Sequence, residues 1–254
     1  LWHGWMPSGP WLRGPDGAPH SAALAVLIDD TLGIAGARHQ PDGRWSVTTE
    51  LSVDYVAPPP CDGSLITSEG TIVASHARGA LVTGSVQDTD AQTLAVMTLR
   101  SRYIPLLPEL ASEAAALQPT VGVVSDGPAA PDAACHDSLL AVLGASAVAD
   151  GELVRLRVPG DIRLTNGSGA LHGGVALAAS QLAASCLLPA GGEMALSSTR
   201  ITYLRQMDIS GGIEFVARVV HGGRSFRVIE VVAYAPGGRT GTVATVAAYA
   251  TNSH

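Results

Sequence analysis

The most unusual absence from this sequence is lysine, because all fifteen of its basic residues are arginines. Without lysine the chain has neither a Schiff-base amine nor the phosphate-binding loop that depends on one. Two phenylalanines and four tryptophans are too few to suggest an aromatic platform for stacking bases. The formal net charge of -7 also offers no basic surface, so we expect no nucleic-acid partner.

Cysteines are scarce too. Cys61, Cys135 and Cys186 are widely spaced and form no metal-ligand cluster with the histidines, so we expect reduced thiols, no metal and a cytoplasmic protein. No run of about eighteen apolar residues is free of polar interruption, and residues 1–11 contain no long apolar run. We therefore expect neither a membrane span nor a signal peptide. Hydrophobic residues still make up 46% of the 254, which is enough for a folded core.

The sequence does contain an internal repeat. Residues 6–20 align without gaps with residues 158–172, at an offset of 152 (172 − 20). Both copies continue with a long apolar run and reach a matching tyrosine, Tyr55 or Tyr203, where the offset is 148 (203 − 55). A shared order of this length indicates a duplication.

Alternating, β-rich segments close each copy. They are residues 65–73, 80–86 and 95–103 in the first copy, and residues 213–220, 225–234 and 241–249 in the second. We predict a first domain over residues 1–104 and a second over 133–254. A Pro- and Ala-rich linker over 105–132 would join them, and a short helix within 132–144 would open the second domain.

Each copy contains one long helix that is apolar almost all the way round, as is typical of a buried helix. A curved antiparallel sheet wrapped around such a helix would bury it. Two such sheets can join edge to edge and cover each other's edge strands. The pattern therefore predicts an α+β fold built from two similar units.

The sequence Leu-His-Gly-Gly-Val-Ala-Leu at 171–177 resembles the His-Gly-Gly motif of the PaaI-like hotdog-fold acyl-CoA thioesterases. The resemblance implies two fused hotdog domains, each a long central helix wrapped by a curved antiparallel β-sheet, which together form a pseudo-dimer. In that family an Asn precedes the His by six residues, and a catalytic Asp or Glu follows it by nine. A Ser or Thr on the next strand helps to hold water.

The second copy keeps one part of this set. It has Asn166, His172, Gly173 and Gly174 at the family's positions, but Gln181 stands at the acidic position. This copy would therefore supply the helix start but not the carboxylate.

The first copy keeps the other part. It has lost the motif, since Gly14 replaces the Asn and His20 is followed by Ser and Ala. It has Asp29 at the acidic position and Thr48 at the Ser or Thr position, where the second copy has Leu196. The two copies together hold one complete set, which predicts one composite active site between them.

The resemblance assigns a role to each residue of the helix start. The Gly173 N–H and the Asn166 amide would polarise a thioester carbonyl and stabilise the oxyanion that forms from it. Gly174 would contact the substrate, and His172 would orient the loop.

Asp29 lies in an apolar helix, where a carboxylate is costly unless it is paired or used. Burial would raise its pKa toward working pH, so that it could act as a general base or as a nucleophile. Thr48 would position the water, and the neighbouring Asp30 would be exposed. Arg224, in a predicted turn between strands, is the candidate for binding the phosphates of coenzyme A.

The function that this resemblance implies is hydrolysis of an acyl-CoA to a carboxylate and free coenzyme A. No cofactor would be needed, since coenzyme A is part of the substrate, and a homodimer of the whole chain is expected. Two alternatives stay open. One is a hotdog enoyl-CoA hydratase or dehydratase, and the other is a non-catalytic protein that binds acyl-CoA or lipid.

Overall fold

The computed structural model describes residues 1–106 and 138–251, and these form two similar units. The first unit contains β1 (Trp2–Pro7), α1 (Ala25–Ala37), β2 (Arg44–Tyr55), β3 (Leu65–His76), β4 (Gly79–Gln87) and β5 (Thr93–Pro105). The second contains α3 (Leu139–Val142), β6 (Ser146–Asp150), β7 (Leu153–Val158), α4 (Gly173–Ser185), β8 (Met194–Tyr203), β9 (Ile213–Gly222), β10 (Phe226–Tyr234) and β11 (Thr240–Ala250). Among these residues no helix is long and apolar enough to cross a membrane.

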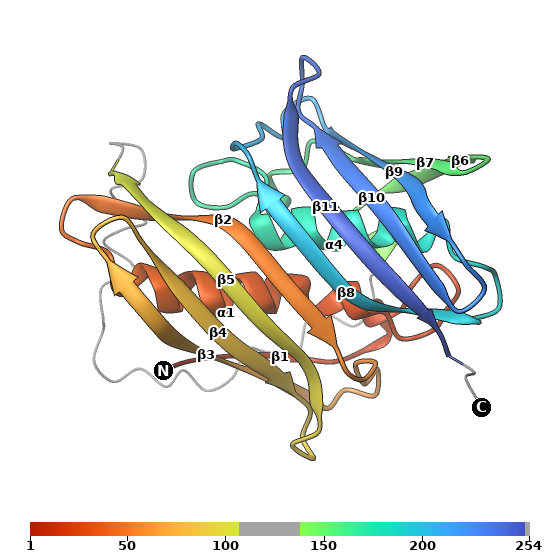
Figure 1. Ribbon diagram of the computed structural model, residues 1–254, viewed down its shortest axis with the longest axis horizontal. Helices are drawn as coiled ribbons and strands as arrows, with labels where there is room; N and C mark the ends of the chain where they lie inside the picture. Colours follow the sequence, from red (N-terminus) through yellow and green to blue (C-terminus); the bar gives the residue numbers. More distant parts are fainter. Residues whose placement is uncertain (107–137, 252–254) are drawn as a thin grey trace.

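One antiparallel sheet runs through both units, in the order β1-β3-β4-β5-β2-β8-β11-β10-β9-β7-β6. The strands of each unit curve around that unit's long helix, as predicted, and β2 and β8 join the two halves (Figure 1). Both helices are buried on nearly every side, since Ile28, Leu32, Leu177 and Leu182 are fully inaccessible to solvent.

The junction between β2 and β8 carries an internal two-fold relation. Ser52 pairs with Arg200 across it, and these two residues differ by the same 148 positions (200 − 52) that separate Tyr55 from Tyr203. A β-bulge leaves out Thr49 on β2 and Ser197 on β8, again 148 positions apart (197 − 49). The two strands therefore have the same register, and Thr48 and Leu196 are structural equivalents.

Pairing at this junction is short. Only Glu50 to Asp54 of β2 pair with β8, whereas residues 44–48 pair with β5 alone. The two strands diverge beyond the junction (Figure 1), so the described residues leave one edge of β2 uncovered over 44–49.

The two long helices contact each other closely at their first turns. A Cβ atom on Gly174 would lie 2.6 Å from the Cα atom of Val26 and 2.8 Å from the backbone oxygen of Ala25. Both are backbone atoms that cannot rotate away, so this crossing requires glycine.

The structure gives the bounds of two helices that the sequence located only approximately. In the first unit a 3₁₀ turn over Ser21–Leu24 precedes α1, so the α-helix begins about one turn later after its histidine than α4 does. The short helix predicted within 132–144 is α3, at Leu139–Val142. Most of the predicted linker, including residues 107–132, lies outside the described residues.

The helix crossing yields a matched prediction. Gly174→Ala should lower the free energy of unfolding by about 1–3 kcal/mol, because the methyl group forces α1 and α4 apart. Gly33→Ala should raise it by about 0.5–1 kcal/mol, because Gly33 lies inside α1 and an added methyl group would have no atom within 4 Å. Chemical denaturation measures both values. Equal stabilities for the two variants would contradict this account of the crossing.

Candidate active site

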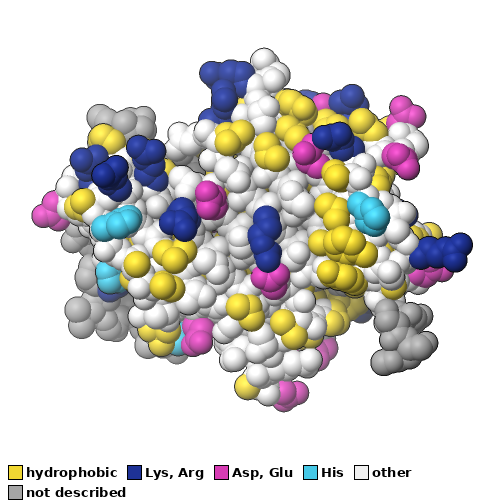
Figure 2. All heavy atoms as spheres, viewed as in Figure 1, with side chains coloured by type: hydrophobic (Ala, Val, Ile, Leu, Met, Phe, Trp, Pro, Cys, Tyr) yellow, Lys and Arg dark blue, Asp and Glu magenta, His cyan; other side chains and the backbone are white. Residues whose placement is uncertain are grey.

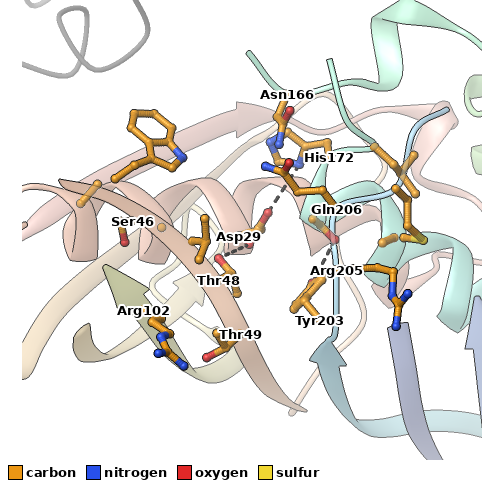
Figure 3. Close-up of a pocket in the computed structure, with 18 of the residues that line it drawn as sticks. Asp29, Ser46, Thr48, Thr49, Arg102, Asn166, His172, Tyr203, Arg205 and Gln206 are labelled. Atoms are coloured by element: carbon orange, nitrogen blue, oxygen red, sulfur yellow. Dashed lines mark hydrogen bonds and ion pairs between the residues drawn. The ribbon is translucent and has the colours of Figure 1, made fainter. Parts of the chain in front are cut away.

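A pocket of about 560 Å³ lies between the two units, within the usual range for small-molecule sites. Residues of α1, β2 and β5 form one wall. The loop before α4, the first turn of α4 and residues 203–207, at the end of β8 and just after it, form the other. Figure 3 shows the polar side chains that converge there from both walls.

His172 forms the start of α4. Its extended backbone places it at the N-cap, and its Nδ1 accepts a hydrogen bond from the Gly174 N–H at 3.0 Å. Gly173 is the first helical residue, so its N–H has no acceptor within the helix and lies at the positive end of the helix dipole. The Tyr203 hydroxyl donates to the Gly173 backbone oxygen at 3.0 Å and holds the following peptide, between Gly173 and Gly174, in place.

Asp29 reaches this helix start from the other unit. It is 8% exposed and is the only buried ionisable carboxylate among the described residues. The Thr48 hydroxyl donates to its Oδ1 at 3.4 Å, and the Nδ1 atom of His172 lies 3.5 Å from its Oδ2 (Figure 3). A Cβ atom on Gly173 would lie only 2.5 Å from Oδ2, so the carboxylate rests directly against the first turn of α4.

The surroundings of Asp29 raise the pKa of its carboxyl group above the ordinary value. Burial is the largest cause, and the negative charge of Asp30 acts in the same direction. The positive charge that His172 carries when it is protonated, the Gly174 N–H and the Thr48 hydroxyl oppose the shift without cancelling it. The group is therefore a stronger base than a carboxylate in water, as the sequence predicted.

Asp30 is exposed, as predicted, but the structure adds a contact that the sequence did not suggest. Its Oδ1 lies 3.0 Å from the Nε2 atom of His172. Because Nδ1 accepts from Gly174, Nε2 carries the proton and donates it to Asp30. The two adjacent carboxylates of α1 therefore both face His172, one from the buried side and one from solvent.

Asn166 lies in the loop before α4. Its Oδ1 accepts hydrogen bonds from the backbone N–H groups of Ser168 at 3.1 Å and Ala170 at 3.2 Å, and from the Ser168 hydroxyl. This turn uses the amide oxygen, so the NH₂ group remains as the donor that Asn166 can offer to a ligand in the pocket.

The structure thus brings five of the seven predicted site residues to one pocket: Asp29, Thr48, Asn166, His172 and Gly173. Gly174 is not among the lining residues, because it packs against the backbone of α1. Arg224 is also elsewhere, in the turn between β9 and β10. Sequence reasoning missed Tyr203, although its match with Tyr55 in the repeat had marked the position.

The equivalent positions in the other half form a different arrangement. Gln181 is fully buried, and its Nε2 donates to the Tyr55 hydroxyl at 2.5 Å and to Thr199 Oγ1 at 3.0 Å. The Nε2 atom of His20 lies 2.8 Å from Ser185 Oγ, and burial lowers the pKa of His20 to about 4. At these equivalent positions, neutral side chains therefore form hydrogen bonds with one another, and no carboxylate takes the place that Asp29 has in the pocket.

Comparison with known proteins points to one class of enzyme. Residues 162–253 match the family described as the acyl-CoA thioesterase N-terminal domain. This match confirms the predicted reaction class, hydrolysis of a thioester.

Solved structures identify the fold. A tesB protein of Mycobacterium avium subsp. paratuberculosis is 9% identical, with a TM-score of 0.66 over 99% of this chain and 93% of that chain. A putative oleoyl thioesterase of Lactobacillus plantarum is 14% identical, with a TM-score of 0.64 over 99% and 97%. A hot dog fold protein of unknown function from Alicyclobacillus acidocaldarius is 13% identical, with a TM-score of 0.61 over 99% and 93%. The chain therefore has the predicted fold of two hotdog units.

The charge of Asp30 provides a test of the site's electrostatics. Asp30→Asn should lower the pKa of Asp29, because it removes a like charge while the amide oxygen still accepts from His172. A ¹³C NMR titration of the side-chain carboxyl groups measures this pKa in both proteins. The account is wrong if Asp29 of the unmodified protein titrates at its ordinary value of 3.8.

Proposed function

We propose that this protein hydrolyses acyl-CoA thioesters at one composite site between its two units. The contact between Asp29 of one unit and the first turn of α4 of the other carries this proposal. A thioester carbonyl beside Gly173 would place its carbon next to the carboxylate. The arrangement follows the PaaI-like division of roles between a helix start and an opposing acidic residue.

The reaction needs a polarised carbonyl and an activated water. The Gly173 N–H and the Asn166 amide would donate to the carbonyl oxygen as it becomes an oxyanion. Asp29 would act as general base and take a proton from a water that Thr48 helps to position. The water oxygen then bonds to the carbonyl carbon, the C–S bond breaks, and the proton passes from Asp29 to the leaving sulfur.

Other groups hold this machinery in position. His172 caps α4 and is itself held by Asp30, while Tyr203 holds the Gly173 carbonyl. Burial and the nearby Asp29 charge raise the pKa of Tyr203, so its hydroxyl remains a donor. These three side chains position the first turn of α4, whose Gly173 N–H would bind the oxyanion.

Arg102, rather than Arg224, is our candidate for binding the phosphates of coenzyme A. It lines the pocket, and among the described residues it has no ion pair, whereas the nearby Arg100 pairs with Glu50 at 3.5 Å. In Figure 3 the Arg102 side chain lies beyond Thr48 as seen from Asp29, and Figure 2 shows arginines gathered on the outer face over this end of the first unit. A homodimer of the chain stays a prediction.

The role of Asp29 can be tested by thiol release from acyl-CoAs. Asp29→Asn keeps the shape of the side chain but removes the base, so kcat should fall by about 10²–10⁴-fold. Gln181→Ala, at the equivalent position of the other half, should cause a much smaller loss. Thiol release that is unaffected by Asp29→Asn would rule out this site, and a protein that binds acyl-CoA or hydrates its chain without releasing thiol would favour the alternatives.

The role of Arg102 can be tested by comparing substrates with and without phosphates. Arg102→Ala should raise KM for an acyl-CoA about tenfold, because a charge-assisted contact is lost. It should leave KM for the matching acyl-pantetheine unchanged, since that compound has no phosphate. Arg224→Ala serves as the matched control, and an equal effect of both variants would contradict the assignment.

A further inference from the structure

A row of small residues on α1 leads away from Asp29. Asp29, Gly33 and Ala37 are spaced four apart, so they lie on one face of the helix, and all three line the pocket. Ile34 lines it beside them, and Ser46 of β2 stands across from this row. The helix therefore borders a channel that starts at the proposed reaction centre.

Gly33 has no packing reason to be glycine. In the interior of a helix a glycine costs about 0.5–1 kcal/mol relative to alanine. A Cβ atom on Gly36 would contact Ser101 and Val82 at 3.4 Å, and one on Gly174 would overlap α1. One on Gly33 would meet no atom of residues 1–106 or 138–251 within 4 Å. The space beside Gly33 is open because it belongs to the pocket.

The other half contains a natural contrast. The residue equivalent to Gly33 is Ser185, at the offset of 152 that relates the two helices (185 − 33). Its hydroxyl donates to the Gln181 backbone oxygen at 2.8 Å and lies 2.8 Å from His20 Nε2. In the second unit, which has Gln181 in place of the carboxylate, the hydrogen-bonded side chain of Ser185 fills this position. In the first unit, which has Asp29, Gly33 leaves the position open.

Beside the edge of β2 that the described residues leave uncovered, residues on both faces of the strand line the pocket. Ser46 and Thr48 face α1, since their partners Ser101 and Tyr103 on β5 are buried against it. The intervening residues face outward with Arg102, and this outer side includes Trp45, Val47 and Ile104. If the phosphates of coenzyme A lie at Arg102 on the outer face, the part of the pocket along α1 remains for the acyl group.

We infer that Gly33 sets the size of the acyl group that this site accepts, by leaving an acyl channel between α1 and β2. The inference rests on the proposed hydrolysis of acyl-CoAs. The channel is lined by Gly33, Ile34 and Ala37, which suit an aliphatic or aryl chain and offer no charge to a polar one.

The test enlarges Gly33 in two steps and follows chain length. For Gly33→Leu, kcat/KM should stay close to the unmodified value with acetyl-CoA but fall about tenfold or more with long acyl-CoAs, as expected for methylene groups excluded from an apolar pocket. Gly33→Ala, which also favours the helix, should only slightly shorten the longest acyl chain that the enzyme hydrolyses well. Leu204→Phe is the matched enlargement on the opposite wall and should leave the length limit unchanged.

Three results would overturn the inference: an equal loss at every chain length in Gly33→Leu, no change at any length, or a shifted limit in Leu204→Phe instead. Calorimetric binding of short and long S-alkyl-CoA thioethers, which cannot be hydrolysed, gives a second reading. Gly33→Leu should weaken only the long thioether. If the unmodified protein releases no thiol from any acyl-CoA, the proposed hydrolysis fails, whereas the thioether series still decides the role of Gly33.

Discussion

The structure depends on one contact, in which the first turn of α4 rests against the side of α1. Gly174 lets the two backbones approach to a separation that no side chain would allow, and Gly173 leaves room for the Asp29 carboxylate beside the helix start. This contact brings an acidic side chain and the unpaired N–H groups of a helix start to the same place. Neither group could reach the other within a single hotdog unit, so the composite pocket requires both halves.

The same constraint explains why the two halves differ. A buried carboxylate is unfavourable unless its surroundings stabilise it, and Asp29 has the Thr48 hydroxyl and the N-terminal start of α4 for this purpose. Gln181 is neutral, and it satisfies its amide NH₂ group with Tyr55 and Thr199. The half without the carboxylate also faces no glycine turn, since Ser21 and Ala22 follow His20 there.

Much of the candidate site could be predicted because the duplication and the family resemblance complement each other. The repeat aligns His20 with His172 and Tyr55 with Tyr203, and the spacing implied by the resemblance then pointed to Asp29 and Thr48, both of which reach the pocket. Contacts that depend on side-chain direction could not be found in this way. Adjacent residues on a helix point about 100° apart, so Asp30 was expected to face solvent, yet its carboxylate reaches around to His172. Arg224 was predicted to bind coenzyme A but lies away from the pocket. Sequence spacing does not show which turns of a unit lie near the pocket that holds Asp29 and Gly173.

The sequence by itself determined that the chain is a duplicated α+β protein with two buried helices. These features follow from hydrophobic periodicity and from the order of residues, which are local properties of the chain. The division of one set of site residues between the halves was predicted from the family resemblance. Only the tertiary structure decided which residues meet across the halves. It also decided that the described residues leave the edge of β2 over 44–49 uncovered and the space beside Gly33 open. Those properties arise where α1, α4, β2 and β8, from distant parts of the chain, approach one another. The distances between these elements depend on tertiary packing, which no local sequence pattern contains.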